Sequence, residues 1–233
     1  LSDIRGAVHR SFEGSLARLR LPRVTLLQLH NSITARRGDE PTSITPHDVL
    51  KPGGIADAFD ELRAEGLVSH LGLTGIGQPD ALRASVVSGR FETMQVPYHL
   101  LNPSAGRAMP AGFAETNYGH IIADCACQQM GVLAIRVLAG GALADNPPSP
   151  HTLKTPFFPL ALYERDRKQA ATLRERLGPQ QTLPREAIRF VLAHSHISSA
   201  LIGFGECWQI TEALEALTPD DSPVHWGDII TSV

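Results

Sequence analysis

Apolar and polar residues follow one another along this chain in a pattern that predicts helices and short buried strands in turn. Residues 4–19 carry apolar side chains three or four positions apart with charged residues between them, which is typical of an amphipathic helix. Residues 24–30 form a short apolar run that ends at His30-Asn31, as expected for a buried strand of a parallel sheet. A long polar loop follows to about residue 46, and such loops at strand ends are more often functional than not.

The same alternation continues to about residue 217. We expect helices from residue 55 to a stop at 65–66, from 79 to about 87, through 121–125, at 162–177, at 184–194 and from about 208, with strands at 68–76, 91–101, 132–138 and 200–204. The segment 146–159 holds five prolines and is predicted to be a loop. Five strands that alternate with helices indicate an α/β fold with a right-handed parallel sheet. This sheet is either open and doubly wound or most of a barrel that lacks its beginning.

Composition narrows the function classes. The 233 residues are expected to form a single domain, and 42% hydrophobic content is ample for a core. The net charge of −3 with no basic block makes nucleic acid an unexpected partner. No stretch is long and apolar enough for a membrane span and no signal peptide opens the chain, so a cytoplasmic location is expected. Cys125, Cys127 and Cys207 have neither disulfide nor zinc-ligand spacing, so no metal site is expected.

Two polar residues in the predicted strands are candidates for chemistry. His30 stands at the carboxyl end of its strand, where open α/β sheets and barrels place their active sites. A structural histidine with a satisfied hydrogen bond is an equally good interpretation. Gln95 puts a primary amide in an otherwise apolar strand, where it forms either a core hydrogen bond or a contact to a carboxamide on a ligand.

Glycines follow two of the predicted strands. Gly140 and Gly141 would let the backbone approach an anion such as a pyrophosphate, although a plain left-handed turn explains them equally well. Gly203-Phe204-Gly205 has the same position before a predicted helix N-terminus. The chain contains no P-loop, no G-x-S-x-G and no H-E-x-x-H motif, and the spacing of Gly72, Gly75 and Gly77 is not that of a dinucleotide fingerprint.

Together these segments resemble the aldo-keto reductases, and they occur in the order of that family. Residues 15–19 with 26–30 resemble its block "SL-rL … iDL-lH", and residues 62–74 resemble "L-x-x-x-G-k-i-r … iGvS". The further matching segments are Gln95–Asn102 with "Q-v-x-Y-N-l-l", Leu138–Leu143 with "PLagG-L", and Ile202-Gly203 with Gln209 and Glu212 with "iiG … q-x-x-E-N". Gln28, Arg136 and the 138–143 run look closest to the sugar-dehydrogenase-like branch.

The resemblance implies a (β/α)8 barrel of TIM type, of which the chain would hold strands four to eight. His30 matches the active-site histidine that hydrogen-bonds the substrate carbonyl, and Thr74 and Gln95 match residues that hold the nicotinamide carboxamide. The residues that match the pyrophosphate and adenosine sites are Leu138, Gly140, Gly141, Leu143, Gly203, Gly205, Gln209 and Glu212. The implied activity is hydride transfer between NAD or NADP and an aldehyde, ketone or aldose.

Several departures from the family pattern bear on that activity. The family's catalytic Asp, Tyr and Lys lie on strands before the histidine, and the residues of this chain contain no counterpart of that set. The chain is therefore expected to be a partial, truncated barrel that is inactive alone, and the open flank of its first strand is expected to allow self-association. Glu206 stands where a basic residue would bind a 2′-phosphate, which favours NAD over NADP.

Two hypotheses of different classes therefore remain. The first is the carbonyl-reducing oxidoreductase just described. The second is a non-catalytic relic of the fold that binds a nucleotide or a protein partner. A third possibility is a structural subunit that completes its barrel with another chain. Sequence upstream that supplied an Asp, a Tyr and a Lys in strand contexts would favour the first hypothesis.

Overall fold

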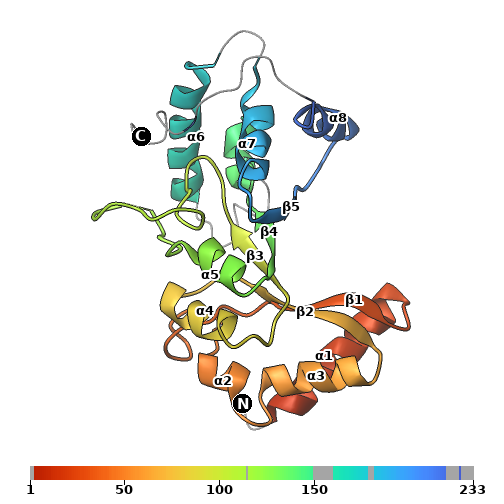
Figure 1. Ribbon diagram of the computed structural model, residues 1–233. Coiled ribbons are helices and arrows are strands. Elements are labelled where there is room, and N and C mark those ends of the chain that lie inside the picture. The colour runs from red at the N-terminus through yellow and green to blue at the C-terminus, as the bar shows by residue number, and fades with distance from the viewer. Residues whose placement is uncertain (1–2, 114, 149–159, 178–180, 219–225, 227–233) are drawn as a thin grey trace. The chain divides into compact units, whose positions relative to one another are not determined.

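The computed structural model describes residues 3–113, 115–148, 160–177, 181–218 and 226 (Figure 1). Its strands form one five-stranded sheet in the order β1-β2-β3-β4-β5, so the expected α/β architecture with a parallel sheet is confirmed. In this part of the chain the sheet has two edges and does not close into a barrel. The strands are β1 (Val24–Leu29), β2 (Val68–Thr74), β3 (Thr93–Pro97), β4 (Gly131–Ile135) and β5 (Ile197–Ala200).

Helices alternate with these strands as the hydrophobic pattern indicates. They are α1 (Ile4–Leu19), α2 (Pro46–Leu50), α3 (Ile55–Ala64), α4 (Pro79–Val86), α5 (Ile121–Cys127), α6 (Leu160–Arg174), α7 (Leu183–Leu192) and α8 (Cys207–Glu215), with a short 3-10 segment, η1 (Ala139–Ala144). Only α2 and η1 were not expected from the sequence. None of the helices in the described ranges is long and apolar enough to cross a lipid bilayer.

The chain divides into two compact units. The first unit comprises residues 1–96 and 107–133, and the second comprises residues 97–106 and 134–233. The expectation that residues 1–233 form one domain stays a prediction.

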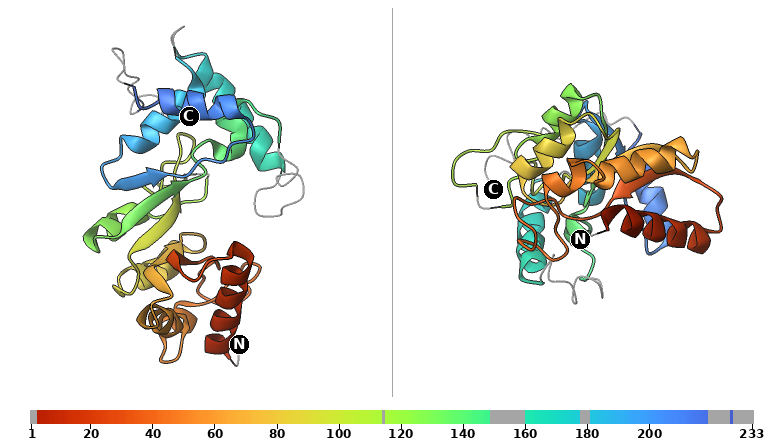
Figure 2. Two further views of the ribbon diagram at one scale, coloured as in Figure 1. Left: turned by 90° about the vertical axis from the view of Figure 1, so that its right-hand side faces the viewer. Right: turned by 90° about the horizontal axis from the view of Figure 1, so that it is seen from below.

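In the first unit, helix α1 begins at a side-chain cap and packs along α3 (Figures 1 and 2). The Asp3 carboxylate accepts a hydrogen bond from the Gly6 N–H at 2.8 Å, which satisfies one of the free N–H groups of the first turn. Ile4 and Phe12 are the buried residues of the helix. Arg5 forms a 2.6 Å ion pair with Glu61 of α3, so the contact combines an apolar stripe with a charged margin.

Strands β1, β2 and β3 are parallel, with Gln28 opposite Gly72 and Gly72 opposite Thr93. Because side chains alternate across a strand, one face carries Leu71, Leu73, Met94 and Val96, each at most 1% exposed. Helix α5 covers part of this apolar face, since the Cys125 Sγ lies 3.5 Å from the Met94 Sδ. The opposite face carries Gln28, Thr74, Thr93 and Gln95.

The loop after β1 is held in place by backbone bridges. Ile33, which is fully buried, pairs with Ile44 across the loop and with Gly77 beyond β2. Gly77 has a φ of +129°, and a side chain there would overlap the Ile33 backbone, so this position requires glycine. Thr45 and Asp48 then form a capping box that starts α2, and Arg37 binds the Asp48 carboxylate through its Nε at 2.7 Å.

The structure corrects the bounds of the predicted strands, and β1 and β2 end at Leu29 and Thr74 rather than at residues 30 and 76. β3 spans residues 93–97 rather than 91–101, and β4 ends at Ile135 because Arg136 adopts a left-handed conformation with a φ of +58°. β5 spans residues 197–200 rather than 200–204. The apolar run 201–204 suggested a buried strand, but its Leu201 and Phe204 are 40% and 44% exposed and follow the strand instead.

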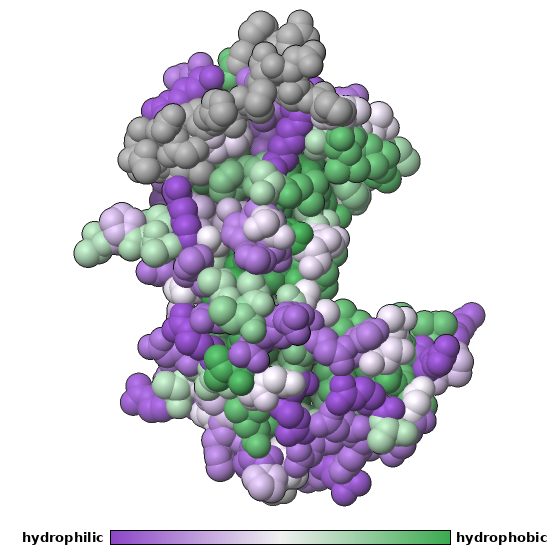
Figure 3. All heavy atoms as spheres, in the orientation of Figure 1, coloured by the Kyte–Doolittle hydropathy of each residue, from purple (hydrophilic) through white to green (hydrophobic). Residues whose placement is uncertain are grey.

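Helix α8 carries large apolar side chains that its own unit does not bury. Trp208, Ile210 and Leu214 are 59%, 45% and 58% exposed, and no residue of the helix is buried. Figure 3 shows the resulting apolar surface over α8. Since an exposed apolar patch of this kind often marks a binding surface, α8 is relevant to the site described below.

We expect Asp48→Asn to lower the free energy of unfolding by about 1–3 kcal/mol, because it removes the charge that Arg37 binds and weakens the capping box. The side chain of Asp48 is 2% exposed while that of Arg37 is 45% exposed. Because solvent screens the exposed partner, we expect a smaller loss of stability than for a fully buried pair. Urea unfolding at pH 7 measures it. Asp80→Asn is the matched control, because Asp80 pairs with Arg83 at 99% exposure and should change stability by less than about 0.5 kcal/mol.

The same pair predicts a pH dependence. The Arg37 guanidinium holds the pKa of the Asp48 carboxyl well below its usual range, despite the opposing effect of burial. The stabilisation is therefore fully present above about pH 4 and is lost as the pH falls toward the lowered pKa. The stability difference between the wild type and Asp48→Asn should shrink on acidification below about pH 4, and a difference that grows would contradict this assignment.

Candidate functional site

His30 directly follows β1 and is exposed. Its side chain makes no hydrogen bond or ion pair with any other described residue, so none of these residues holds the imidazole in a structural role. Gln28, two residues earlier, projects from one face of β1, and the two-residue alternation of a strand directs His30 to that same face. The structure therefore leaves the imidazole available to a ligand on the polar face of the sheet.

Thr74, the last residue of β2, is opposite Gln95, which lies in the middle of β3. The Gly75 N–H donates to the Gln95 carbonyl oxygen at 2.6 Å, which closes the pairing just beyond β2. Thr74 is 2% exposed, and its hydroxyl has no hydrogen-bond partner among the described residues. A buried hydroxyl without a partner is costly, so this one is a candidate contact for a bound molecule.

The side-chain amide of Gln95 is held by Gln28. The Gln95 Nε2 donates to the Gln28 Oε1 at 2.8 Å, and this bond places both side chains on the polar face of the sheet. His30, Thr74 and Gln95, which the sequence indicated separately, therefore form a row across three adjacent strands on one face of the sheet. The sequence analysis did not assign Gln28 to the site, although its position two residues before His30 is the signal that could have done so.

In the second unit, the glycines after β4 form a turn. Gly140 and Gly141 have φ values of +67° and +102° inside η1. The N–H groups of Gly141 and Leu143 both donate to the Leu138 carbonyl, at 2.9 and 3.2 Å, so these two donors are not open to a ligand in this conformation. Leu143 is fully buried in a core cluster with Tyr163, so its side chain has a structural role here.

The segment after β5 is organised by Gln209. The Gln209 Oε1 accepts hydrogen bonds from the backbone N–H groups of Gly205 and Glu206, at 2.8 and 3.1 Å. The Glu206 side chain in turn accepts from the backbone N–H of Gln209, and this pair of contacts caps α8. Gly203, by contrast, has open space where a side chain would project.

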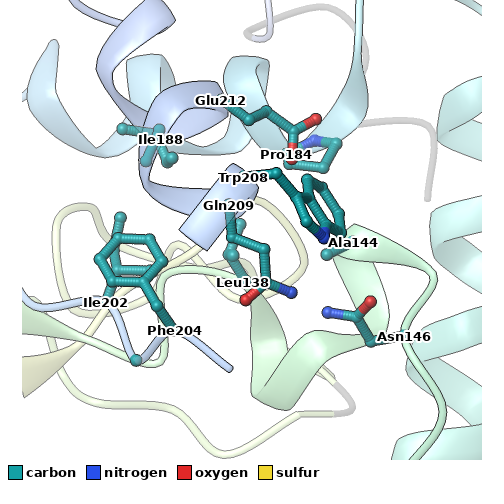
Figure 4. A pocket seen from close by; sticks show the side chains of 12 residues that line it. Leu138, Ala144, Asn146, Pro184, Ile188, Ile202, Phe204, Trp208, Gln209 and Glu212 are labelled. Atoms are coloured by element: carbon teal, nitrogen blue, oxygen red, sulfur yellow. The ribbon is translucent and has the colours of Figure 1, made fainter. Parts of the chain in front are cut away.

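A shallow hollow lies between the turn at η1 and α8, within the second unit (Figure 4). Its cavity volume of about 30 Å³ has room for about two water molecules in this conformation. Four of the residues expected at the cofactor line it, namely Leu138, Gly203, Gln209 and Glu212. The indole of Trp208, which the sequence places next to the predicted adenosine residues, borders it. The amide of Asn146 also borders it and was not predicted from the sequence to be part of the site.

His99 stands where the aldo-keto reductase pattern has asparagine, and it is 9% exposed. Burial, together with the charges of Arg136 and Arg165, lowers the pKa of His99 to about 3. The imidazole is therefore neutral at pH 7 and supplies no positive charge to a ligand. Its Nδ1 has no hydrogen-bond partner among the described residues.

Comparisons with known proteins agree with the geometry. The model of the Aldo/keto reductase family matches residues 2–223. The fold is similar to that of the aldo-keto reductase AKR11C1 from Bacillus halodurans, with a TM-score of 0.65 in the apo form and 0.66 in the holo form at 18% identity. The glycerol dehydrogenase AKR11B4 from Gluconobacter oxydans gives a TM-score of 0.66, also at 18% identity. No curated protein matches the chain.

These matches cover nearly all of this chain but a smaller share of each solved structure. The alignments cover 98% of this chain and 68% and 67% of the two AKR11C1 chains, and 99% of this chain and 64% of AKR11B4. The chain thus spans about two thirds of the length of these solved structures. At this level of identity the likeness concerns the fold alone.

We expect the buried His99 to make stability depend on pH. The pKa of His99 is lower in the folded chain than the value near 6.5 expected on unfolding. Above pH 6.5 the imidazole is neutral in both states and does not change the stability. Below pH 6.5 the unfolded chain binds a proton that the folded chain does not, so the stability falls. Unfolding at pH 7 and pH 5 should show a loss on the order of 2 kcal/mol that His99→Asn removes. An equal loss in the variant would mean that other groups cause it.

Proposed function

Because this chain belongs to the Aldo/keto reductase family, we propose that it contributes to an oxidoreductase site that uses a nicotinamide cofactor. The cofactor supplies the hydride that is exchanged with the carbonyl carbon of an aldehyde, ketone or aldose. In this proposal the imidazole of His30 hydrogen-bonds the carbonyl oxygen and orients it. The observation that carries the proposal is the row of His30, Thr74 and Gln95 across three parallel strands, at the carboxyl ends of β1 and β2 and in the middle of β3.

The residues of this row fit a carboxamide. Such a group has an oxygen that accepts and an NH2 that donates hydrogen bonds. Thr74 offers a buried hydroxyl that lacks a partner among the described residues, and Gln95 retains its Oε1 as an acceptor because its Nε2 is bound to Gln28. A hydroxyl that can donate and an amide oxygen that can accept are the two partners that the carboxamide needs.

We propose that the hollow beside α8 receives the adenosine part of the cofactor. Trp208 provides a large flat surface at its margin, and Glu212 and Gln209 provide polar groups for ribose or base. The hollow would have to widen, because a ligand pocket of ordinary size holds about 300–1,000 Å³. The 59% exposure of Trp208 leaves its side chain free to move.

We further propose that NAD binds at least as well as NADP. Glu206 is the charged residue nearest in sequence to the glycines after β5, and its carboxylate would repel a 2′-phosphate rather than pair with it. No arginine or lysine lies between Gly203 and Glu212.

A titration of the 233-residue chain with NADH and NADPH tests binding and preference together. We expect the fluorescence of Trp208 to change on binding, with a dissociation constant for NADH equal to or lower than that for NADPH. Trp208→Phe should remove the signal, and the remaining Trp226, which is 7% exposed, serves as an internal reference. A clearly tighter NADPH complex would refute the preference and the position proposed for the loop at Glu206.

We also propose that this chain on its own does not turn over. Carbonyl reduction needs a proton donor within hydrogen-bond reach of the oxygen, and general acid catalysis is typically worth about 10²–10⁴-fold. Tyr98 is 5% exposed and stacks on Phe190 at a centroid distance of 5.1 Å, while the hydroxyl of the buried Tyr163 donates to the Asn146 carbonyl. Both tyrosines therefore have structural roles. The third tyrosine, Tyr118, lies in the loop before α5 and not at the end of a strand, so the proton donor is unassigned in this chain.

An assay with NADH or NADPH and simple aldehydes or aldoses should give no steady turnover. Sedimentation of the same sample is the control, because β1 is an edge strand with unpaired backbone groups and we propose that copies associate through it. Steady turnover by monomeric chain that His30→Ala abolishes would contradict the proposal of inactivity. Cofactor binding without turnover would agree with it.

A further inference from the structure

The geometry points to Gln28 as the residue that sets which end of the Gln95 amide faces the ligand, and thereby as a determinant of selectivity for the carboxamide form of the cofactor. This inference rests on the proposed function, since it concerns the same row of residues. It adds a positioning residue that does not itself touch the ligand. The contact that suggests it is the 2.8 Å bond from the Gln95 Nε2 to the Gln28 Oε1.

The bond spans an entire strand. Gln28 lies on β1 and Gln95 on β3, with β2 between them. The two side chains can meet because the residue of β2 opposite Gln28 is Gly72. A Cβ at Gly72 would lie 3.0 Å from the Gln28 Cγ and 3.2 Å from its Nε2, and it would overlap the Thr93 hydroxyl. Because Gly72 has no side chain, the side chain of Gln28 can pass over β2 and reach Gln95 on β3.

An amide has two different ends, and the surroundings of Gln28 decide its orientation. The Gln28 Nε2 faces the Leu73 carbonyl oxygen at 3.5 Å, a position that favours an NH2 group over an oxygen. With that end fixed, the Oε1 of Gln28 is the acceptor that remains. Gln95 must then turn its own NH2 toward Gln28, which leaves the Gln95 Oε1 as an acceptor next to Thr74.

This orientation makes the site selective. A nicotinamide group can donate from its NH2 to the Gln95 Oε1, whereas a nicotinate group has a carboxylate that only accepts and would be repelled by that oxygen. Without Gln28 the Gln95 amide can rotate and offer its NH2 instead, and a carboxylate would then be accepted. Gln28 therefore controls the ratio of the two affinities rather than binding in general.

The test compares Gln28→Met with Gln28→Glu. Methionine has a similar length but no acceptor of comparable strength, whereas glutamate keeps an acceptor for the Gln95 Nε2. Calorimetric titration with NAD, with its nicotinic acid analogue and with ADP-ribose gives three dissociation constants for each protein. Because ADP-ribose lacks the ring, it reports whether the rest of the site is intact.

We expect the wild type to prefer NAD over the acid analogue by about tenfold, a ratio of the size that one hydrogen bond supports. Gln28→Met should reduce this preference to about threefold or less, Gln28→Glu should retain it, and ADP-ribose should bind all three proteins alike. A preference that is unchanged in Gln28→Met, or equally lost in both variants, overturns the role of Gln28 while leaving the proposed function in place. Failure of the wild type to bind any of the three ligands overturns the proposed function and this inference with it.

Discussion

The parallel register of β1, β2 and β3 is the constraint on which the candidate site depends. It sets Gln28 opposite Gly72 and Thr74 opposite Gln95, so that side chains from three separate strands line up in rows. Because alternate residues point to opposite faces, a slip by one residue would move the polar row into the helix-covered core. The fully buried Leu73 and Met94 on the other face oppose such a slip, since their apolar area would become exposed.

The polar face of the sheet contains one pair of side chains that hydrogen-bond each other and one buried hydroxyl that has no partner among the described residues. The Gln95 Nε2 and the Gln28 Oε1 satisfy each other across Gly72, while the Gln95 Oε1 is left as an acceptor. The Thr74 hydroxyl, buried at the end of the same row, has no such partner among the described residues. A hydrogen-bonded pair beside an unsatisfied hydroxyl is the pattern expected of a site whose side chains are already oriented before a ligand binds.

The second unit presents a different kind of surface. Its turn at η1 and the start of α8 use backbone N–H groups internally, through the Leu138 carbonyl and the Gln209 side chain. In this conformation most of the residues that line the hollow can contribute side chains, with Trp208 and Glu212 among them. Recognition there would therefore rest on stacking and side-chain hydrogen bonds more than on a backbone nest.

The periodicity of apolar residues by itself determined the order of elements, the bounds of α1 and the start of α3, because a strong amphipathic pattern and Gly or Pro stops act locally. It also indicated His30 at the end of a strand and Gln95 inside one, while Thr74 was indicated by the resemblance to the aldo-keto reductases. Tertiary structure alone decided that β5 lies at 197–200, that the glycines at 140 and 141 form an internally bonded turn, and that Gln28 binds Gln95. These features depend on groups far apart in the sequence, here 67 positions for Gln28 and Gln95, and no local pattern encodes which of them meet.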